Sequence, residues 1–408
     1  MPTYPHRMGS VMRPVGVAER RARLAARHHL APPFRGAPSP GGVAGVVDGI
    51  IALHGTDPAS VYLAAWARTG ASRADIEHAL YAEGALVRMM GMRRTVFVVP
   101  AGLVPVVQAA CTDQIAARLR RDLAKQVRES GIAADADGWL KDVGEATVAA
   151  LAARGSAAGA ELAKDEPRLR AQLVFPNAAG KSYGAPVNVT SRLLTVLSAE
   201  GLIVRGRPRG GWTSMQFTWT VAPDQPPLEA AVARAELARR WLHAFGPALP
   251  ADLQWWAGWT AAQTRQALGQ LELTEVDLDG TAGVMLASDE DAGADLQAAE
   301  APWAVLLPAL DPAAMGWRER GWYLGGHTAA LFDRSGNIGP TAWWDGRIVG
   351  GWAQRADGEI AVRLLEDAGA EAQAALAAEA QRLREWIGDP VTRITPRFRT
   401  PLERELNV

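Results

Sequence analysis

The first hundred residues alternate between helix-like and strand-like patterns of apolar and polar positions. The apolar spacing predicts helices over residues 17–31, 43–53, 59–68 and 72–83. Asp57 and Ser72 are suited to cap the last two, because a short polar side chain can accept a hydrogen bond from the first N–H groups of a helix. Two short β runs follow at residues 85–89 and 95–99, joined by the basic turn 91–94. Several helices closed by a two-stranded basic hairpin are typical of the winged helix, a variant of helix-turn-helix.

The same order of elements recurs twice. A helix over residues 189–200 is followed by strand 202–205, a basic turn at 206–211 and strand 216–221. A third set consists of helices and a strand at residues 230–244, 250–257, 261–268 and 274–279. The strand of this third set carries Glu275, Asp277 and Asp279, so we do not expect it to contact phosphate.

From residue 304 the pattern changes to short strands separated by Gly and Asp turns. The expected strands are residues 304–307, 323–324, 339–344, 347–352 and 360–364, with a hairpin signal at Asp345-Gly346. A helix over 370–386 and an extended tail over 389–408 complete the chain. We therefore expect an α+β fold with three tandem winged-helix motifs, then a small β-barrel, and a C-terminal helix with an extended tail. The expected domains are residues 14–130, 131–222, 223–300 and 301–408.

Composition narrows the class of protein. The chain has 408 residues, of which 48% are hydrophobic and 21% charged, so it can bury several cores. It contains neither an apolar run long enough to span a membrane nor a secretory leader, so we expect a cytoplasmic protein. Cys111 is the only cysteine, and the seven histidines form no His-x-x-x-His pair, so no disulfide and no metal site are predicted. No nucleotide-binding loop is recognisable, and we expect no cofactor.

The net charge of -1 conceals an uneven distribution. Residues 1–130 carry 17 Lys and Arg against 9 Asp and Glu, and residues 181–222 carry 5 against 1, whereas residues 223–300 carry 4 against 13. Basic faces of this kind are suited to bind an anionic partner such as double-stranded DNA. Arginine makes up 39 of the 43 basic residues, but a GC-rich genome also explains that ratio, so it decides nothing.

The candidate DNA contacts lie in three basic segments. The end of the first predicted helix carries Arg27, His28 and His29. The first hairpin carries Arg88, Arg93 and Arg94, and the second hairpin carries Arg205, Arg207 and Arg209. Such side chains would position the protein through phosphate contacts. The competing interpretation of each residue is a solvated arginine or histidine on a surface loop.

Several short strings resemble the winged-helix DNA glycosylases of the AlkZ/YcaQ type, over roughly residues 17–400. They are residues 53–58 with 62–68, 86–88 with 92–95, 245–252, 306–312 with 318 and 320, 339–350 and 396–398. Each string is moderately specific, and their collinear order is the stronger signal. The resemblance implies three tandem winged helices followed by a small β-barrel. It also implies excision of alkylated purines, including bulky adducts and interstrand cross-links.

The resemblance further implies that a hairpin of the barrel enters the DNA minor groove. Trp317, Arg318, Arg320 and Trp322 match that region, and Arg397 lies in the matching tail. An aromatic wedge has precedent among minor-groove binders. The chain has 15 Trp residues, however, so the competing interpretation places most of them in the core.

The catalytic signature of the family is Gln-x-Gln or Gln-x-Asp just ahead of an Asp-Pro pair. The matching positions are His54 and Thr56, followed by Asp57. Hydrolysis at an anomeric carbon needs a positioned water and stabilisation of the positive charge that develops. Neutral His54 could accept a proton from that water, Thr56 could hold it by a hydrogen bond, and Asp57 could contribute electrostatically. The opposing interpretation is that His54 is a helix-end histidine and that the catalytic pair has been lost.

Two classes of function follow. The first is a monofunctional DNA repair glycosylase that acts as a monomer on damaged double-stranded DNA without a metal or cofactor. A lyase step through a lysine Schiff base is not expected, because the four lysines lie between residues 125 and 181, away from the motif. The second class is a non-catalytic winged-helix DNA-binding protein, or a self-resistance protein that sequesters a DNA-reactive compound. Release of a free alkylated base separates the two classes.

Overall fold

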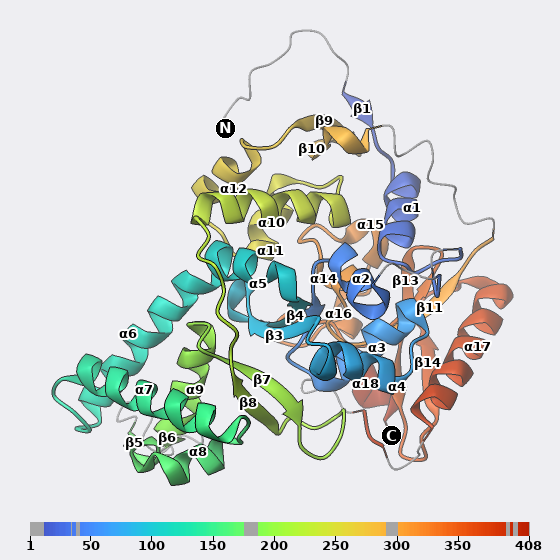
Figure 1. The fold of residues 1–408 in the computed structure, drawn as a ribbon. Helices are drawn as coiled ribbons and strands as arrows, with labels where there is room; N and C mark the ends of the chain where they lie inside the picture. The colour runs from blue at the N-terminus through green and yellow to red at the C-terminus, as the bar shows by residue number, and fades with distance from the viewer. Residues whose placement is uncertain are drawn as a thin grey trace.

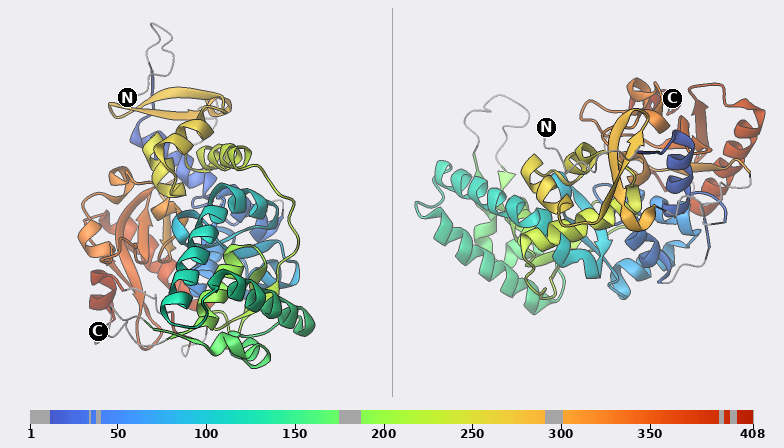
Figure 2. Two further views of the ribbon diagram at one scale, coloured as in Figure 1. Left: turned by 90° about the vertical axis from the view of Figure 1, so that its left-hand side faces the viewer. Right: turned by 90° about the horizontal axis from the view of Figure 1, so that it is seen from above.

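The structure is a computed structural model that describes residues 12–33, 35–37, 41–174, 187–290, 301–388, 392–394 and 399–407. It comprises three units of helices with a β-hairpin, residues 12–112, 113–222 and 223–290, and a C-terminal unit, residues 301–407, built on a four-stranded sheet (Figure 1). In Figure 1 the first unit lies in the centre, the second to its lower left, the third above and the C-terminal unit to the right. Figure 2 shows that the second unit projects to one side of the others.

The first unit holds the segment with the His54-x-Thr56 pair. Its elements are α1 Val17–Arg27, α2 Gly42–Gly49, β2 Leu53–His54, α3 Pro58–Thr69, α4 Arg73–Glu77, the π-helical turn η1 His78–Ala82, β3 Leu86–Met90, the 3-10 turn η2 Met92–Arg94 and β4 Val96–Pro100. Strands β2 and β3 flank β4 in an antiparallel sheet. The helix predicted over residues 43–53 ends earlier, because Leu53 and His54 pair with β4.

The helix caps predicted for the first unit are confirmed. The carboxylate of Asp57 accepts a hydrogen bond from the backbone N–H of Ala59 at 3.1 Å, and Pro58 is the first residue of α3. Ser72 and Asp75 form a capping box at the start of α4. Because Asp57 lies only three residues after His54, its cap fixes the point at which the backbone turns from β2 into the helix.

The second unit has a hydrophobic core of its own. After η3 Ala101–Leu103, α5 Val104–Val107 and η4 Gln108–Thr112, its elements are α6 Asp113–Glu129, α7 Ala136–Arg154, α8 Gly159–Asp165, η5 Pro167–Arg170, β5 Gln172–Leu173, β6 Val187–Asn188, α9 Val189–Ala199, β7 Ile203–Pro208 and β8 Phe217–Val221. The sequence predicted α9 and the hairpin β7–β8, but nothing between residues 101 and 188. Leu119, Leu123 and Val127 of α6 pack in this core, so the chain enters the second unit before residue 130.

The third unit follows the predicted order of elements closely. It comprises α10 Ala230–Phe245, α11 Pro250–Ala257, α12 Ala261–Leu268, β9 Leu273–Leu278 and β10 Thr281–Leu286. The short strand β1 Arg13–Pro14 pairs in parallel with β9 and places Arg13 opposite Val276. Residues at the start of the described chain therefore extend the sheet of the third unit.

The C-terminal unit is a four-stranded antiparallel sheet with helices around it. Its elements are β11 Ala304–Leu307, α14 Pro312–Met315, α15 Gly321–Leu324, α16 Thr328–Leu331, β12 Thr341–Trp344, β13 Arg347–Gln354, β14 Ile360–Leu364, α17 Gly369–Ile387 and α18 Pro401–Leu406. The strands are ordered β11-β12-β13-β14, and α17 packs against both outer strands. Strands β11 and β14 are not paired with each other, so the predicted closed barrel is not confirmed in the described part of the chain.

Two local predictions for the C-terminal unit are wrong. Residues 323–324 belong to the helical turn α15 and not to a strand, because the buried Tyr323 ring stacks on Trp343 and its hydroxyl donates to the carbonyl oxygen of Ala314 at 3.0 Å. The tail predicted as extended contains the helix α18, which begins at a capping box of Thr400 and Glu403.

A buried ion pair joins the first unit to the C-terminal unit. The guanidinium of Arg68, at the end of α3, contacts both carboxylate oxygens of Asp311, at 2.7 and 2.8 Å, and both side chains are fully buried. Asp311 also accepts a hydrogen bond from the backbone N–H of Ala313 at 2.9 Å and so caps α14. This bidentate geometry fixes the orientation of α3, and with it the segment before α3, against the C-terminal unit.

No helix within the described ranges is long and apolar enough to cross a membrane. Among the same residues, no group of three or more His, Cys, Asp and Glu side chains is arranged to hold a metal ion.

Candidate active site and nucleic-acid interface

The His54-Gly55-Thr56 segment lies between the short strand β2 and the helix α3. His54 pairs with Phe97 of β4, and the backbone N–H of Gly55 donates to the carbonyl oxygen of Val96 at 2.7 Å. The sequence folds in this way because Leu53 is buried in the core on one side of the segment and the Asp57 cap starts α3 on the other. Two elements of regular structure therefore hold both ends of the segment.

Glycine at position 55 is required by the close approach of its neighbours. A Cβ atom added there would lie 3.1 Å from the carbonyl carbon of Phe97 and 3.2 Å from both the carbonyl oxygen of Val96 and Nη1 of Arg88. The Nη1 atom of Arg88 donates a hydrogen bond to the carbonyl oxygen of Gly55. The backbone of Gly55 is therefore held through its N–H by β4 and through its carbonyl by a buried arginine.

His54 is half-buried and neutral. Burial, followed by the positive charge of Arg93, lowers the pKa of its imidazole to about 3. The backbone N–H of Thr56 approaches Nδ1 of His54 at 3.5 Å, and the ring meets Phe97 edge-on, with centroids 5.4 Å apart. With Nδ1 as the acceptor, the ring proton resides on Nε2, so this nitrogen is a hydrogen-bond donor. A ring of such low basicity is a poor proton acceptor.

Asp57 is the acidic group next to the segment. Its carboxylate accepts hydrogen bonds from the N–H of Ala59 at 3.1 Å and the hydroxyl of Ser60 at 3.3 Å. Burial raises the pKa of Asp57, against the effect of these hydrogen bonds and of the positive charge of Arg88. The carboxylate thus combines the predicted capping role with a charge held in a mostly buried position.

Glu403 is a residue that the sequence analysis missed. It is buried on α18, and burial together with the negative charge of Asp57 raises its pKa to about 7. The C-terminal helix therefore brings a second carboxyl group within electrostatic reach of Asp57. The Thr400-Pro401-x-Glu403 pattern, a capping box with proline at the first helical position, is a sequence signal that could have revealed this helix.

A cationic cluster lies beside His54. The guanidinium of Arg93 lies 3.9 Å from the ring centroid of Trp255 on α11, and that of Arg320 lies 5.0 Å from the same ring. Burial, together with the charge of Arg320, lowers the pKa of Arg93 to about 10. The structure thus brings together two predicted DNA contacts, Arg93 and Arg320, from the first and C-terminal units, near the ring of Trp255 of the third unit.

Three residues predicted to contact DNA are buried instead. Arg88 holds Gly55, and Trp317 donates from its ring N–H to the carbonyl oxygen of Phe245 at 3.1 Å. His28 lies between Phe245 and Trp317, with Nε2 at 3.2 Å from the carbonyl oxygen of Ala244, and burial lowers its pKa well below the usual value. These side chains belong to the interior and cannot reach a DNA surface in this conformation, which corrects their predicted role.

Arg27 and His29 lie at the end of α1. Arg27 forms an ion pair with Asp289 at 2.8 Å and donates to the carbonyl oxygen of Gly246 at 3.0 Å, so it links α1 to the third unit. His29 is half-buried and adopts a positive φ of 51°. Arg27 therefore has intramolecular partners that a phosphate would have to replace.

The second hairpin presents its arginines at the surface. Arg207 pairs with Glu77 of the first unit, and Arg209 pairs with Glu161 at 2.6 Å. Arg205 lies near Phe217 and Trp219, with its guanidinium 5.5 Å from each ring centroid.

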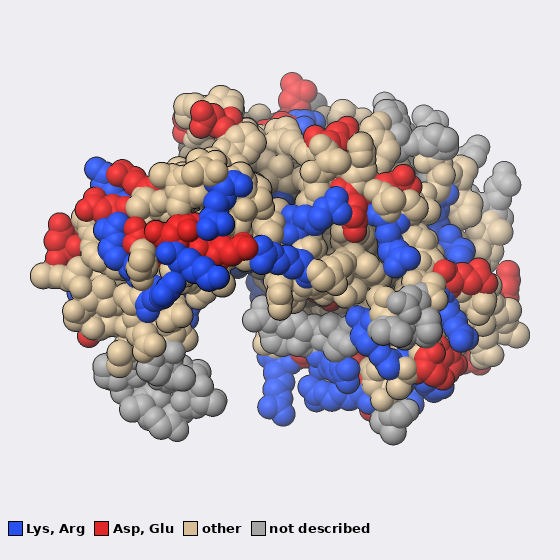
Figure 3. All heavy atoms as spheres, turned by 60° about the horizontal axis from the view of Figure 1, so that its bottom comes forward, with Lys and Arg blue, Asp and Glu red and all other residues tan. Residues whose placement is uncertain are grey.

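Two further predicted DNA contacts belong to the C-terminal unit. Arg318 is exposed, with Glu319 at 3.9 Å, whereas Arg397 lies outside the described residues. In Figure 3, Lys and Arg side chains border a notch between the lobe on the left, which is the second unit, and the rest of the molecule.

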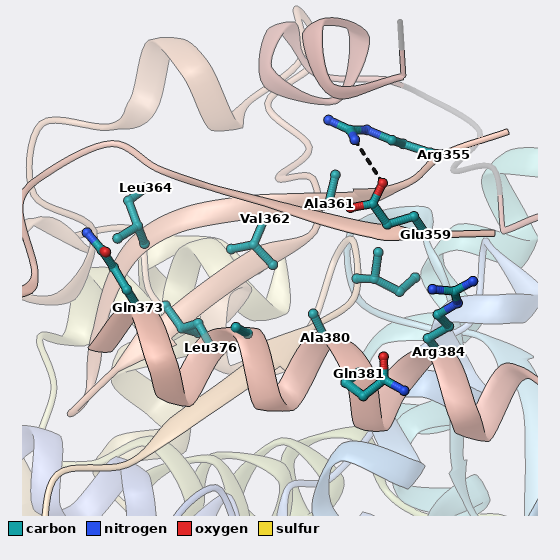
Figure 4. Close-up of a pocket in the computed structure, with 12 residues that line it drawn as sticks. Arg355, Glu359, Ala361, Val362, Leu364, Gln373, Leu376, Ala380, Gln381 and Arg384 are labelled. Carbon is teal, nitrogen blue, oxygen red and sulfur yellow. Dashed lines mark hydrogen bonds and ion pairs between the residues drawn. The ribbon is translucent and has the colours of Figure 1, made fainter. Parts of the chain in front are cut away.

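A cavity of about 570 Å³ lies away from the motif, between β14 and α17 (Figure 4). Its walls combine apolar side chains, such as Val362 and Leu376, with the polar side chains of Gln373, Gln381 and Arg384. Arg355 and Glu359 form an ion pair of 2.8 Å at its edge. This lining offers no arrangement of acid, base or nucleophile, so the cavity carries no candidate chemistry.

Comparison with known proteins gives the same glycosylase family that the short sequence motifs resemble. A family model described as DNA glycosylase AlkZ-like matches residues 47–386. Among solved structures, the Streptomyces sahachiroi DNA glycosylase AlkZ is similar to this chain with a TM-score of 0.70 and 20% sequence identity, over 94% of this chain and 99% of that one. No curated protein sequence matches.

Proposed function

The chain belongs to the AlkZ-like family of DNA glycosylases, and we propose that it hydrolyses the N-glycosidic bond of alkylated or bulky-adduct purines, including those in interstrand cross-links. In this proposal it acts as a monofunctional repair enzyme, as a monomer on damaged double-stranded DNA, in the cytoplasm at the nucleoid and without a metal or cofactor. The observation that carries the proposal is the rigid His54-Gly55-Thr56-Asp57 segment beside the Arg93–Trp255–Arg320 cluster. This arrangement pairs groups suited to glycosidic hydrolysis with cations suited to phosphate.

The fold supports a DNA-binding interpretation of the three helix-and-hairpin units. In each of them a helical segment precedes an antiparallel hairpin, β3–β4, β7–β8 or β9–β10. We interpret these units as winged helices and the four-stranded sheet of the C-terminal unit as the counterpart of the small barrel. Arg94 and Arg318 are exposed at positions from which they can contact the DNA backbone, and Arg207 and Arg209 can do so by exchanging a carboxylate for a phosphate.

The chemistry assigns distinct roles to the three residues of the motif. Cleavage of an N-glycosidic bond leaves positive charge on the sugar, and the Asp57 carboxylate is the nearby group of the motif that stabilises it electrostatically. Thr56 positions the attacking water through its hydroxyl. His54 acts as a hydrogen-bond donor through Nε2, because its pKa of about 3 and the contact at Nδ1 oppose the proton-accepting role expected from the sequence. A cationic purine adduct is a good leaving group and demands little acid catalysis.

One observation favours the second candidate function, a non-catalytic DNA-binding or self-resistance protein. Neither position 54 nor position 56 carries the glutamine or aspartate of the family signature, and His54, with a pKa of about 3, is a poor acceptor for the proton of the attacking water. In that case the cationic surfaces would still bind duplex DNA, but no base would be released.

The deciding experiment measures release of free N7-methylguanine from a methylated duplex. We expect release by the wild-type protein and a loss of about 100-fold or more for Asp57→Asn and Thr56→Val, with a smaller loss for His54→Ala. Asn can cap α3 as Asp does, so the first variant tests the charge and not the fold. Wild-type protein that binds the duplex but releases no base from any adduct would identify the second candidate.

A further inference from the structure

A cavity of about 390 Å³ lies where the first, second and third units meet. Arg93 and Arg94 of the turn η2 line it from the first unit, Gln114 and Arg118 of α6 line it from the second, and Gly258 and Trp259, which follow α11, line it from the third. None of its lining residues is an aspartate or a glutamate. The cavity thus gathers three guanidinium groups from two different units without a neutralising carboxylate in its walls.

The arginines of this cavity differ from the other basic residues in their partners. The guanidinium of Arg94 has neither an ion pair nor a hydrogen bond within the described ranges. Arg118 approaches Asp122 at 3.9 Å, with both side chains mostly exposed. In contrast, Arg207 and Arg209 of the second hairpin are paired with glutamates. Positive charge at the junction of the units is therefore paired only weakly, through the exposed contact of Arg118 with Asp122, whereas Arg207 and Arg209 of the second hairpin form close ion pairs.

Backbone strain in the turn η2 also favours a ligand site at this cavity. Arg93 and Arg94 have φ values of 52° and 60°, a left-handed conformation that costs an L-residue about 1 to 2 kcal/mol. The turn packs closely against Gly258, where an added Cβ would lie 3.0 Å from Cγ and 3.3 Å from the backbone nitrogen of Arg93. The opposite wall is fixed by Trp259, whose ring N–H donates to the carbonyl oxygen of Ala110 at 3.0 Å. Two strained arginines held between rigid walls are typical of a ligand contact.

We propose that this cavity binds a backbone phosphate of the DNA strand that carries the reacting nucleotide. The inference rests on the proposed function for the identity of its ligand, DNA, and adds a site formed by Arg94, Arg118 and Gln114. Guanidinium forks bind phosphate oxygens in pairs, and the amide of Gln114 supplies a further N–H donor. Arg93 lines the cavity, and its charge also acts on His54, so the cavity lies within electrostatic reach of the candidate catalytic segment.

The test removes the two exposed arginines singly and together and measures how duplex binding depends on salt. The variants are Arg94→Gln, Arg118→Gln and the double variant. The control is Arg384→Gln, which removes an exposed arginine of α17 that lines the separate cavity of Figure 4. Dissociation constants for an undamaged duplex of about 20 base pairs are measured by fluorescence anisotropy from about 50 to 400 mM KCl.

If both arginines hold one phosphate, each single variant weakens binding about 3- to 10-fold, and the salt slope of the double variant falls by about one and not by two. The Arg384→Gln control keeps the wild-type slope. An unchanged slope in the double variant, or an equal fall in the control, would overturn the proposal. Since Arg94 and Arg118 are exposed, thermal unfolding of the variants is expected to match the wild type and serves as the check on folding.

Two further readouts separate the alternatives. Binding of inorganic phosphate is measured by calorimetry on the wild type and the double variant. Phosphate binding that is lost in the double variant, while duplex binding is unchanged in the same variant, would assign the cavity to a free anion and overturn the assignment to DNA. Base release from a methylated duplex is measured on the same variants. Wild-type protein whose binding depends on Arg94 and Arg118, but which releases no base, would retain the phosphate site and reject the glycosylase activity.

Discussion

The buried guanidinium of Arg88 donates a hydrogen bond to the carbonyl oxygen of Gly55, the central residue of the candidate catalytic segment. Arg88 also lies over the ring of Phe217 on β8, with its guanidinium 4.7 Å from the ring centroid. One side chain thus connects the catalytic segment of the first unit to the hairpin of the second. Arg88, which was predicted to contact DNA, instead holds the backbone of the candidate catalytic segment from the protein interior.

The tight environment of Gly55 predicts that Gly55→Ala displaces His54 and Thr56. An added methyl group would approach the backbone of Phe97 and Val96 to 3.1 and 3.2 Å, and backbone atoms cannot yield as a flexible side chain can. We expect base release to fall at least about 10-fold and the free energy of unfolding to fall by about 1 to 3 kcal/mol. Gly102→Ala in the same unit is the matched control, because no atom lies within 4 Å of its added Cβ. Wild-type activity in Gly55→Ala would show that the segment is not held as described.

The pH dependence of base release follows from the two groups of the motif. Burial keeps the pKa of His54 near 3, so its protonation leaves no step near pH 6.5 in single-turnover rates. Burial raises the pKa of Asp57, so this carboxylate becomes neutral at a higher pH than an ordinary aspartate, and the rate falls on the acid side as its charge is lost. Rates are measured from about pH 4 to 9 after subtraction of spontaneous depurination.

The Asp57→Asn variant is the control for that profile. It is expected to lack the acid limb and to react more slowly at neutral pH, because its side chain carries no charge at any pH. A step near pH 6.5 in the wild type that disappears in His54→Ala would instead assign proton transfer to the histidine and contradict the donor role.

Much of the fold could be predicted from the sequence because local signals determine it. The Asp57-Pro58 and Ser72-x-x-Asp75 caps begin α3 and α4 as expected, since a cap depends on residues only two or three positions away. Strand β11 was predicted with its observed limits at residues 304–307. The strand β2 was missed because two residues become a strand only by pairing with β4, more than forty positions along the chain.

The candidate site was predictable only in part, for the same reason. The position of His54, Thr56 and Asp57 follows from local sequence, but the partners that set their chemistry do not. Arg93 and Arg320 meet on Trp255 only because three units pack together, and no spacing in the sequence encodes that contact. The burial of His28 likewise depends on Ala244 and Trp317, which lie more than two hundred positions away.

The raised pKa of Glu403 predicts a pH-dependent stability. The pKa is about 7 in the folded protein, against about 4.3 for an unfolded chain, so the folded state favours the protonated carboxyl. Its contribution to stability is therefore full below about pH 4 and is lost as the pH rises to 7. Glu403→Gln cannot ionise and keeps an acceptor for the N–H of Thr400. We expect this variant to exceed the wild type in free energy of unfolding at pH 8 by about 2 to 4 kcal/mol and to match it at pH 4.

Urea unfolding at the two pH values checks this prediction. Glu405→Gln, on the same helix but exposed, serves as the control and is expected to change stability by less than about 1 kcal/mol at either pH. Equal shifts of the unfolding midpoint at pH 4 and pH 8 for Glu403→Gln would mean that Glu403 titrates normally.

The buried Arg68–Asp311 pair predicts a large cost when one partner is lost. Asp311→Asn retains a cap for α14 but leaves the guanidinium of Arg68 without a counter-ion in the interior, so the free energy of unfolding is expected to fall by about 3 to 5 kcal/mol. Adding Arg68→Met removes the unpaired charge, and the double variant should recover at least about 1 kcal/mol relative to the sum of the single changes.

The exposed pair of Arg128 and Asp137, 3.2 Å apart on α6 and α7, is the control for burial. Arg128→Gln is expected to cost less than about 1 kcal/mol, because solvent screens the pair and both side chains remain hydrated without each other. Urea unfolding of the four variants measures these differences. Additive effects of Arg68→Met and Asp311→Asn would show that the two residues are not coupled, and α3 would then owe its orientation beneath the His54 segment to apolar packing alone.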